Sequence, residues 1–186
     1  MRCGWRPGRS GVACVWAQGL PGLLQIEEYA RPVFAIWRPL LDEETVQRRT
    51  AARLDRQQVF ARMPAPTISF TEEALLRRPL GGKGVMRGQL EQILLHGQRR
   101  NVEIQVMPTE WEEHARLGGA FTYIETCEGR RVAYGEAYKV SRLHTARKTA
   151  REIEEQYGSS GHRRPHRANR SPLLRSCWEK HEHRRD

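Results

Sequence analysis

Apolar residues that recur at helical or strand spacing lie almost entirely within residues 19–158, which confines a folded core to the middle of the chain. Charge is distributed in the opposite way. Residues 159–186 contain eight Arg or Lys and three acids, residues 1–18 contain three Arg and no acid, and the middle contains 21 basic and 19 acidic residues. We therefore predict a domain over residues 19–158, flanked by disordered basic segments at residues 1–18 and 159–186. Removal of both flanks is expected to leave a folded core.

The formal net charge of +10 raises the question of nucleic-acid binding. Because the excess charge lies at the two ends, the nearly neutral middle would bind phosphate poorly. The basic ends could hold RNA or DNA without sequence preference, but a solvated tail is the simpler interpretation.

Neither a membrane span nor a secretion signal is visible in the sequence. No stretch approaches the roughly 20 apolar residues that a membrane helix requires, and residues 1–18 have no apolar run typical of a signal peptide. The four cysteines (Cys3, Cys14, Cys127 and Cys177) are far apart and form no C-x-x-C pair. We expect a cytoplasmic protein with reduced thiols and no membrane association.

Hydrophobic periodicity and capping residues predict helices over residues 21–37, 42–63, 72–78, 85–96 and 144–157. Asp42 is a good N-cap for the second helix, whose outer face is rich in arginine, and Pro32 should kink or end the first helix near Ala30. Met86, Leu90, Ile93 and Leu94 share the apolar face of the fourth helix.

Alternating apolar residues predict strands over residues 67–71, 102–107, 121–126 and 131–136. The first two strands flank helical segments and should form a parallel pair, whereas the last two should form a hairpin. The predicted fold class is α+β (mixed α/β), with a small mixed sheet of about four strands packed by helices.

Three motifs invite a chemical interpretation, and each has a plainer one. Gly82-Lys83-Gly84 with Gly88 lacks the spacing of a phosphate loop and follows a helix and a proline, so a joint is favoured. Glu112-Glu113-His114 is not a zinc-protease motif, and a loop histidine is the commoner interpretation. Cys177, His181 and His183 could bind a metal only if packing fixed their geometry.

Glu73, after the first strand, and Glu103, on the second, resemble a nuclease carboxylate pair. The lysine that usually follows such a pair is Gln105 here, and two surface acids are the simpler interpretation. We therefore assign no catalytic, cofactor-binding or metal-binding residue, expect no cofactor, and predict that the chain is not an enzyme.

Five ordered motifs in the middle of the chain resemble those of a known family. They are Leu20–Arg31 (LPGLLQIEEYAR), Glu73–Pro79 (EALLRRP), Asn101–Pro108, His114–Phe121 and Val132–Glu136 (VAYGE). Together they resemble the domain of unknown function that follows an XRE-type helix-turn-helix in Scr family antitoxin-like transcriptional regulators of bacteria.

This resemblance implies a non-catalytic regulatory domain that binds a partner or ligand, typically a small toxin-like protein encoded nearby, and that could also form a homodimer. Only 19 residues precede Leu20, so we expect a truncated copy without the helix-turn-helix and without sequence-specific DNA binding by this chain alone. After Gly158 the family continues with an amphipathic helix. Here a basic tail follows, which suggests that residues 159–186 are read in a shifted frame. The alternative functions are a nuclease-like or degenerate nuclease domain and a non-specific nucleic-acid binder that acts through its basic tails.

Overall fold

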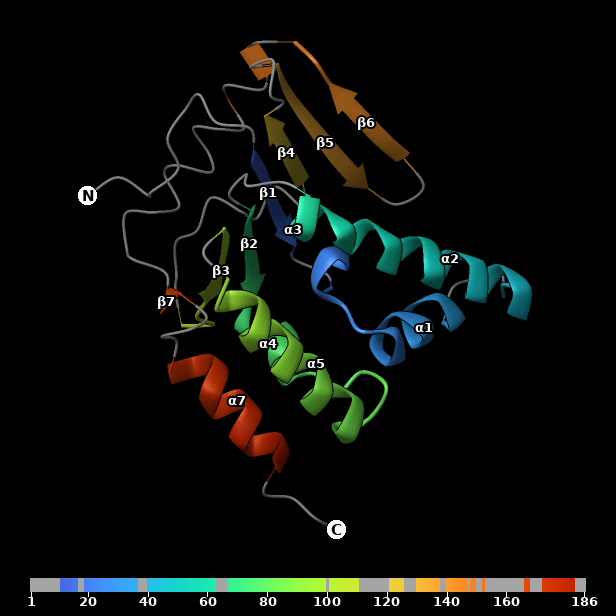
Figure 1. Ribbon diagram of the computed structural model, residues 1–186, viewed down its shortest axis with the longest axis vertical. Coiled ribbons are helices and arrows are strands. Elements are labelled where there is room, and N and C mark those ends of the chain that lie inside the picture. The colour runs from blue at the N-terminus through green and yellow to red at the C-terminus, as the bar shows by residue number, and fades with distance from the viewer. Residues whose placement is uncertain are drawn as a thin grey trace.

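A seven-stranded mixed sheet with helices packed beside it forms the described part of the chain, in a computed structural model (Figure 1). The structure describes residues 11–16, 19–36, 40–62, 67–99, 101–110, 121–125, 130–137, 140–146, 148–149, 152, 166–167 and 172–182. The mixed α+β class predicted from the sequence is confirmed. The sheet is larger than the predicted four strands, because three further strands join it.

The strand order is β6-β5-β4-β1-β2-β3-β7. Strands β1 (Gly11–Trp16), β2 (Thr67–Glu72) and β3 (Val102–Met107) are parallel to one another. On the other side of β1, strands β4 (Phe121–Glu125), β5 (Arg131–Ala137) and β6 (Val140–His144) continue the sheet in antiparallel fashion. The short β7 (His166–Arg167) pairs antiparallel with β3. The predicted parallel pair and hairpin are therefore both confirmed.

The connection between β2 and β3 carries α4 (Glu73–Arg77) and α5 (Lys83–Gly97). Gly81 and Gly82 join these helices with φ angles of 76° and 99°, a region that glycine adopts without steric strain. The expected apolar face of α5 is confirmed in its main part, because Met86, Leu90 and Ile93 are fully buried, and Leu94 packs against the same core.

The segment before β2 forms an arm of two packed helices (Figure 1). After a 3-10 turn, η1 (Gly22–Leu24), come α1 (Glu27–Ala35) and α2 (Glu43–Asp55). Asp42 is the N-cap of α2, and its carboxylate accepts a hydrogen bond of 2.7 Å from Thr45 N. A second 3-10 turn, η2 (Arg56–Gln58), leads into the short α3 (Val59–Arg62).

Two local predictions differ from the structure. The sequence predicts that Pro32 kinks or ends the first helix, and it does not end it, because α1 continues to Ala35. In so short a helix the proline removes a single backbone hydrogen bond, and Ile36 N still reaches Pro32 O at 3.1 Å. His144 does not begin a helix but ends β6, while residues 148, 149 and 152 are helical and the rest of 147–157 lies outside the described residues.

The prediction that residues 1–18 are disordered is wrong for residues 11–16. These residues form β1, which lies in the interior of the sheet and pairs with both β2 and β4. A strand in this position gains backbone hydrogen bonds on both sides, a stabilisation that charge composition does not reveal.

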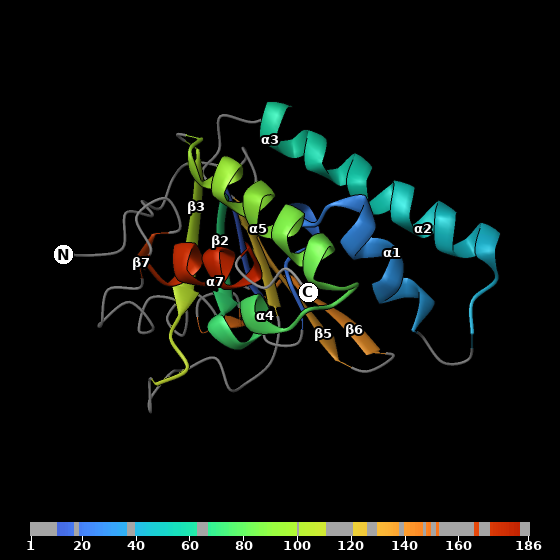
Figure 2. The same ribbon diagram turned by 90° about the horizontal axis from the view of Figure 1, so that it is seen from below.

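The prediction that residues 159–186 are a disordered tail is also wrong for residues 166–167, which form β7, and for residues 172–182. Residues 172–182 form the helix α7 (Pro172–Glu182), which packs on α4 and α5 (Figure 2). Leu174 is fully buried and Cys177 is 1% exposed. A helix therefore does follow Gly158 in this chain, and it packs on α4 and α5. None of the described helices is long and apolar enough to span a membrane.

Candidate functional site

Two buried glutamines hold residues 20–26, the first part of the Leu20–Arg31 motif, in place. Gln89 on α5 donates to Leu24 O at 2.7 Å and accepts from Ile26 N at 2.9 Å. Gln25 donates to Leu20 O at 2.7 Å and accepts from Arg53 Nη1 at 2.8 Å. Both amide side chains are used to satisfy buried backbone groups, so these two polar residues serve the fold.

Arg53 illustrates why the arginine-rich face of α2 is not simply a solvated surface. Its guanidinium lies 4.1 Å from the centre of the Phe34 ring on α1 as well as bonding to Gln25. The cation–π contact holds α1 and α2 together within the arm, and the hydrogen bond to Gln25 joins α2 to the segment before α1.

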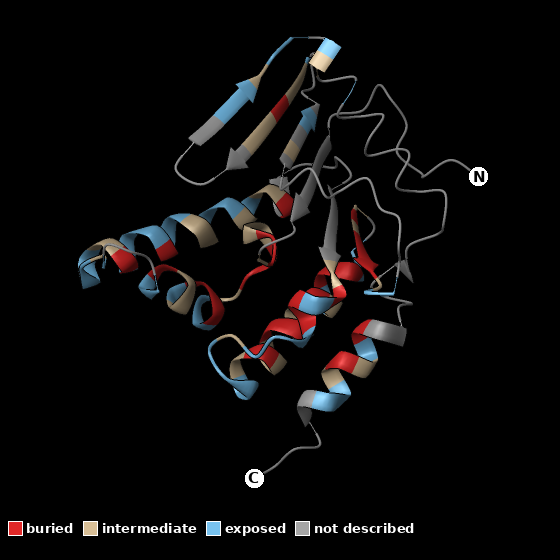
Figure 3. Ribbon diagram, turned by 180° about the vertical axis from the view of Figure 1, so that it is seen from behind, coloured by how far each residue is buried: buried red, intermediate tan, exposed pale blue. Residues whose placement is uncertain are grey.

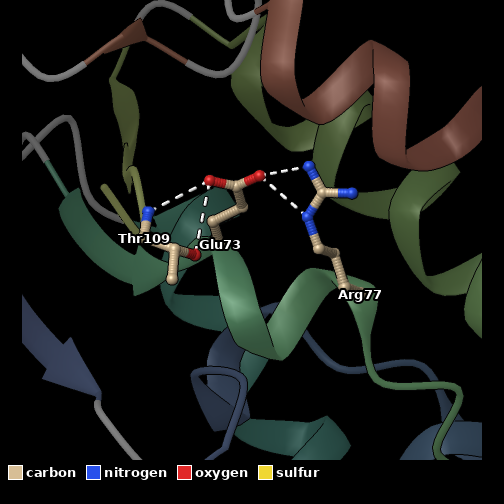
Figure 4. Close-up of polar contacts among 3 residues, drawn as sticks. All are labelled: Glu73, Arg77 and Thr109. Atoms are coloured by element: carbon tan, nitrogen blue, oxygen red, sulfur yellow. Dashed lines mark hydrogen bonds and ion pairs between the residues drawn. The ribbon is translucent and has the colours of Figure 1, made fainter. Parts of the chain in front are cut away.

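The carboxylate of Glu73, at the first position of α4, where it follows β2, makes contacts on both of its oxygens (Figure 4). Its Oε1 accepts hydrogen bonds from Arg77, one turn later, including one of 2.8 Å from Nε. Its Oε2 accepts one of 3.1 Å from Thr109 N and one of 3.5 Å from Thr109 Oγ1. The carboxylate therefore ties the beginning of α4 to the residues that follow β3.

Burial alone would raise the pKa of Glu73, whose side chain is nearly enclosed, but the other contacts outweigh it. The Thr109 amide and the Arg77 guanidinium hold the pKa below its usual value. A carboxylate that is ionised and occupied on both oxygens is a poor general acid or base, since a catalytic group needs a free site and a pKa near the working pH. Its geometry is that of a structural clamp.

The structure does not bring together the two acids that resemble a nuclease pair. Glu103 lies opposite Ile68 in the β2–β3 register, five residues before Glu73. At about 3.3 Å per residue, the two positions are roughly 16 Å apart along the sheet. Glu103 instead accepts a hydrogen bond of 2.6 Å from Gln105. A metal ion that both carboxylates share is incompatible with this separation.

The other residues that the sequence offered for phosphate or metal binding either have a structural role or lie outside the described residues. Lys83 starts α5 directly after a helix–helix turn, as the joint interpretation predicts. Cys177 faces the core between α7 and its neighbours, and burial raises the pKa of its thiol. Residues 112–114 and His183 lie outside the described residues. Within the described residues, no group of three or more His, Cys, Asp or Glu side chains could hold a metal ion.

A different kind of site lies at the β6 end of the sheet. By cross-strand register, one face of this end carries the apolar side chains of Ile124 on β4, Val132 and Tyr134 on β5, and Leu143 on β6. We call these four residues the apolar stripe. Leu143 is 65% exposed and Ile124 is 36% exposed, and Figure 3 shows this exposure along β4 and β6.

The opposite face of the same strands carries different chemistry. Arg131, Arg142 and His144 share it with Ala133, which is fully buried. Sequence reasoning identified β5 but missed β6, because it assigned no element to residues 137–143 and began a helix at His144. Val140–His144 (VSRLH) is short and does not alternate apolar with polar residues, so it carries no clear strand pattern.

Comparison with known proteins gives one match. The family model described as "Domain of unknown function (DUF5753)" matches residues 10–161, which begins before the predicted domain start at residue 19 and so includes β1. No curated protein and no solved structure matches the chain significantly. Since the matched region spans most of the 186 residues, the chain belongs to the DUF5753 family of domains of unknown function.

Proposed function

We propose that this chain is a non-catalytic regulatory domain that binds a partner protein in the cytoplasm, and that it derives from an antitoxin-like regulator of the XRE family. The five sequence motifs that resemble that domain support the proposal, and four of them lie wholly within the described residues. The partner implied by the resemblance is a small toxin-like protein encoded nearby.

The observation that carries the proposal is the apolar stripe. Leu143 and Ile124 are exposed on the same sheet face as the half-buried Val132 and Tyr134. Single exposed apolar residues are ordinary, but a neighbouring set on a sheet is typical of a surface that another molecule covers. The separation of Glu73 from Glu103 favours this binding role over the nuclease alternative.

Co-expression with the product of any small gene encoded beside this one, the partner that the resemblance implies, tests the proposal. We expect a stoichiometric complex on size exclusion, and we expect Leu143→Glu to weaken it strongly because a charge would be buried at the interface. Leu95→Glu is a matched control, since Leu95 is 58% exposed on α5, away from the sheet end.

Three results would overturn the proposal. One is the absence of a complex with the neighbouring gene product. Another is Mg²⁺-dependent DNA cleavage that Glu73→Ala abolishes, which would favour the nuclease alternative. The third is binding only to nucleic acid with a steep salt dependence, which would favour a phosphate-binding role for the basic ends.

A further inference from the structure

The outer strand β6 offers an open edge for pairing. It is the first strand in the sheet order and pairs with β5, and no other strand of the described residues lies on its far side (Figures 1 and 3). In an antiparallel strand, every second residue directs its N–H and C=O groups away from the neighbouring strand. An edge of this kind is a template for a strand from another chain.

The side chains of β6 limit which strand would fit. Arg142 is exposed and His144 is half-exposed on one face, while Leu143 is 65% exposed on the other. The described residues 140–146 and 148–149 contain Arg142, His144 and Lys148 and no acid. A strand paired with β6 would therefore meet positive charge on one face and an apolar side chain on the other.

We propose that β6 binds an extended acidic segment of a partner protein, in which acidic and apolar residues alternate, by adding it as a further strand to the sheet. This inference rests on the proposed function and names the surface and the chemistry of the partner. The acids of the added strand face Arg142 and His144, and its apolar residues extend the apolar stripe beyond Leu143.

Two other occupants fit the edge less well. A second copy of this chain would place one basic β6 against another, and like charges directly opposite in a sheet are destabilising. Nucleic acid would match the positive charge, but it would use neither the backbone groups of the edge nor Leu143 on the opposite face. Charge and alternation together favour an acidic strand.

A synthetic peptide of alternating Glu and Val residues, labelled with a fluorophore, provides the probe. We expect the full chain to bind it in an anisotropy titration, with an affinity that falls as salt increases. Arg142→Glu should weaken binding about tenfold, because a cross-strand attraction becomes a repulsion. Arg175→Glu is the matched control, since Arg175 is exposed on α7 and the same charge change there should leave the affinity unaltered.

A peptide with N-methyl groups on the residues that face β6 separates strand addition from simple charge attraction. It keeps every charge but removes the backbone donors, so we expect it not to bind. Equal binding of the methylated peptide, or equal loss in both arginine variants, would refute strand addition at β6. Failure of the Glu-Val peptide together with Arg142-dependent binding of a single-stranded oligonucleotide would assign the edge to nucleic acid.

The outcomes also separate this inference from the proposed function. If the neighbouring gene product forms a complex that Arg142→Glu does not weaken, the β6 assignment is wrong while the partner-binding role stands. If the peptide binds at β6 but that product does not, the edge assignment stands and the proposed partner is wrong.

Discussion

Replacement of Leu174 by alanine tests whether α7 is part of the folded core. Leu174 is fully buried in the main hydrophobic cluster, and α7 is held by further contacts of Trp178. The Trp178 indole donates to Glu91 Oε1 at 3.2 Å, and Arg87 lies 5.6 Å from the Trp178 ring centre. A helix of 11 residues is marginally stable alone, so its order depends on this packing.

The expected loss follows from the burial. Truncating a fully buried leucine to alanine removes about 2–5 kcal/mol of stability, with a larger loss where the cavity cannot collapse. We expect about 3 kcal/mol here, from a total that is typically about 5–15 kcal/mol. For a chain of this size the melting temperature should fall by about 6–12 °C.

Urea denaturation followed by circular dichroism measures the change, and thermal unfolding gives a second reading of it. Arg175→Ala, at the exposed neighbouring position, should stay within about 0.5 kcal/mol of the unmodified protein. If Leu174→Ala were as stable as this control, α7 would not be packed on the domain. By the same reasoning, removing residues 159–186 should destabilise the protein, contrary to the expectation from charge composition alone.

Three further outcomes are expected. Glu73→Gln should lower the free energy of unfolding by about 1–3 kcal/mol, measured by urea denaturation. Since the pKa of Glu73 is lowered in the folded state, its contribution is present above about pH 4.5 and is lost as the pH falls. If the variant lost stability with falling pH just as the unmodified protein does, Glu73 would not be a clamp. His96 has a lowered pKa because it is buried and lies near Arg99, so the unfolded state takes up a proton at a higher pH than the folded state and stability should fall below about pH 6.5. His96→Leu should weaken this pH dependence of the melting temperature between pH 5 and 7. An identical pH dependence in the variant would show that His96 does not cause it. Gln89→Leu should lose about 2–4 kcal/mol by leaving two buried backbone groups unpaired, whereas a melting temperature like that of the unmodified protein would show that water replaces the amide.

Local signals in the sequence were reliable where the physics is local. The Asp42 cap and the start of α2 coincide because a side-chain acceptor three residues before a free amide acts within one turn. The glycines before α5 mark a turn for a similar reason, since positive φ angles depend on the residue itself. The apolar face of α5 corresponds to its buried side, because periodicity reports which side of a helix is buried. The alternation in β3 marks a real strand as well, although both faces of this strand are largely buried.

Only the tertiary structure decided the elements whose stability comes from distant partners. Residues 11–16 become an interior strand through hydrogen bonds to β2 and β4, and residues 172–182 become a helix by packing on α4 and α5. In α7, Leu174, Cys177 and Trp178 have helical spacing, but three apolar residues in a basic segment are too weak a pattern to outweigh its composition.

The same division applies to the candidate site. In the sequence, Glu73 and Glu103 resemble a carboxylate pair. The parallel register of β2 and β3 places them about five residues apart along the sheet, because the register is set by the two strands as a whole and not by their acidic side chains. The residue types of Arg142 and Leu143 were visible in the sequence, but their position on an open edge was not. That position follows from strand order, which long-range pairing sets and which neither composition nor local periodicity contains.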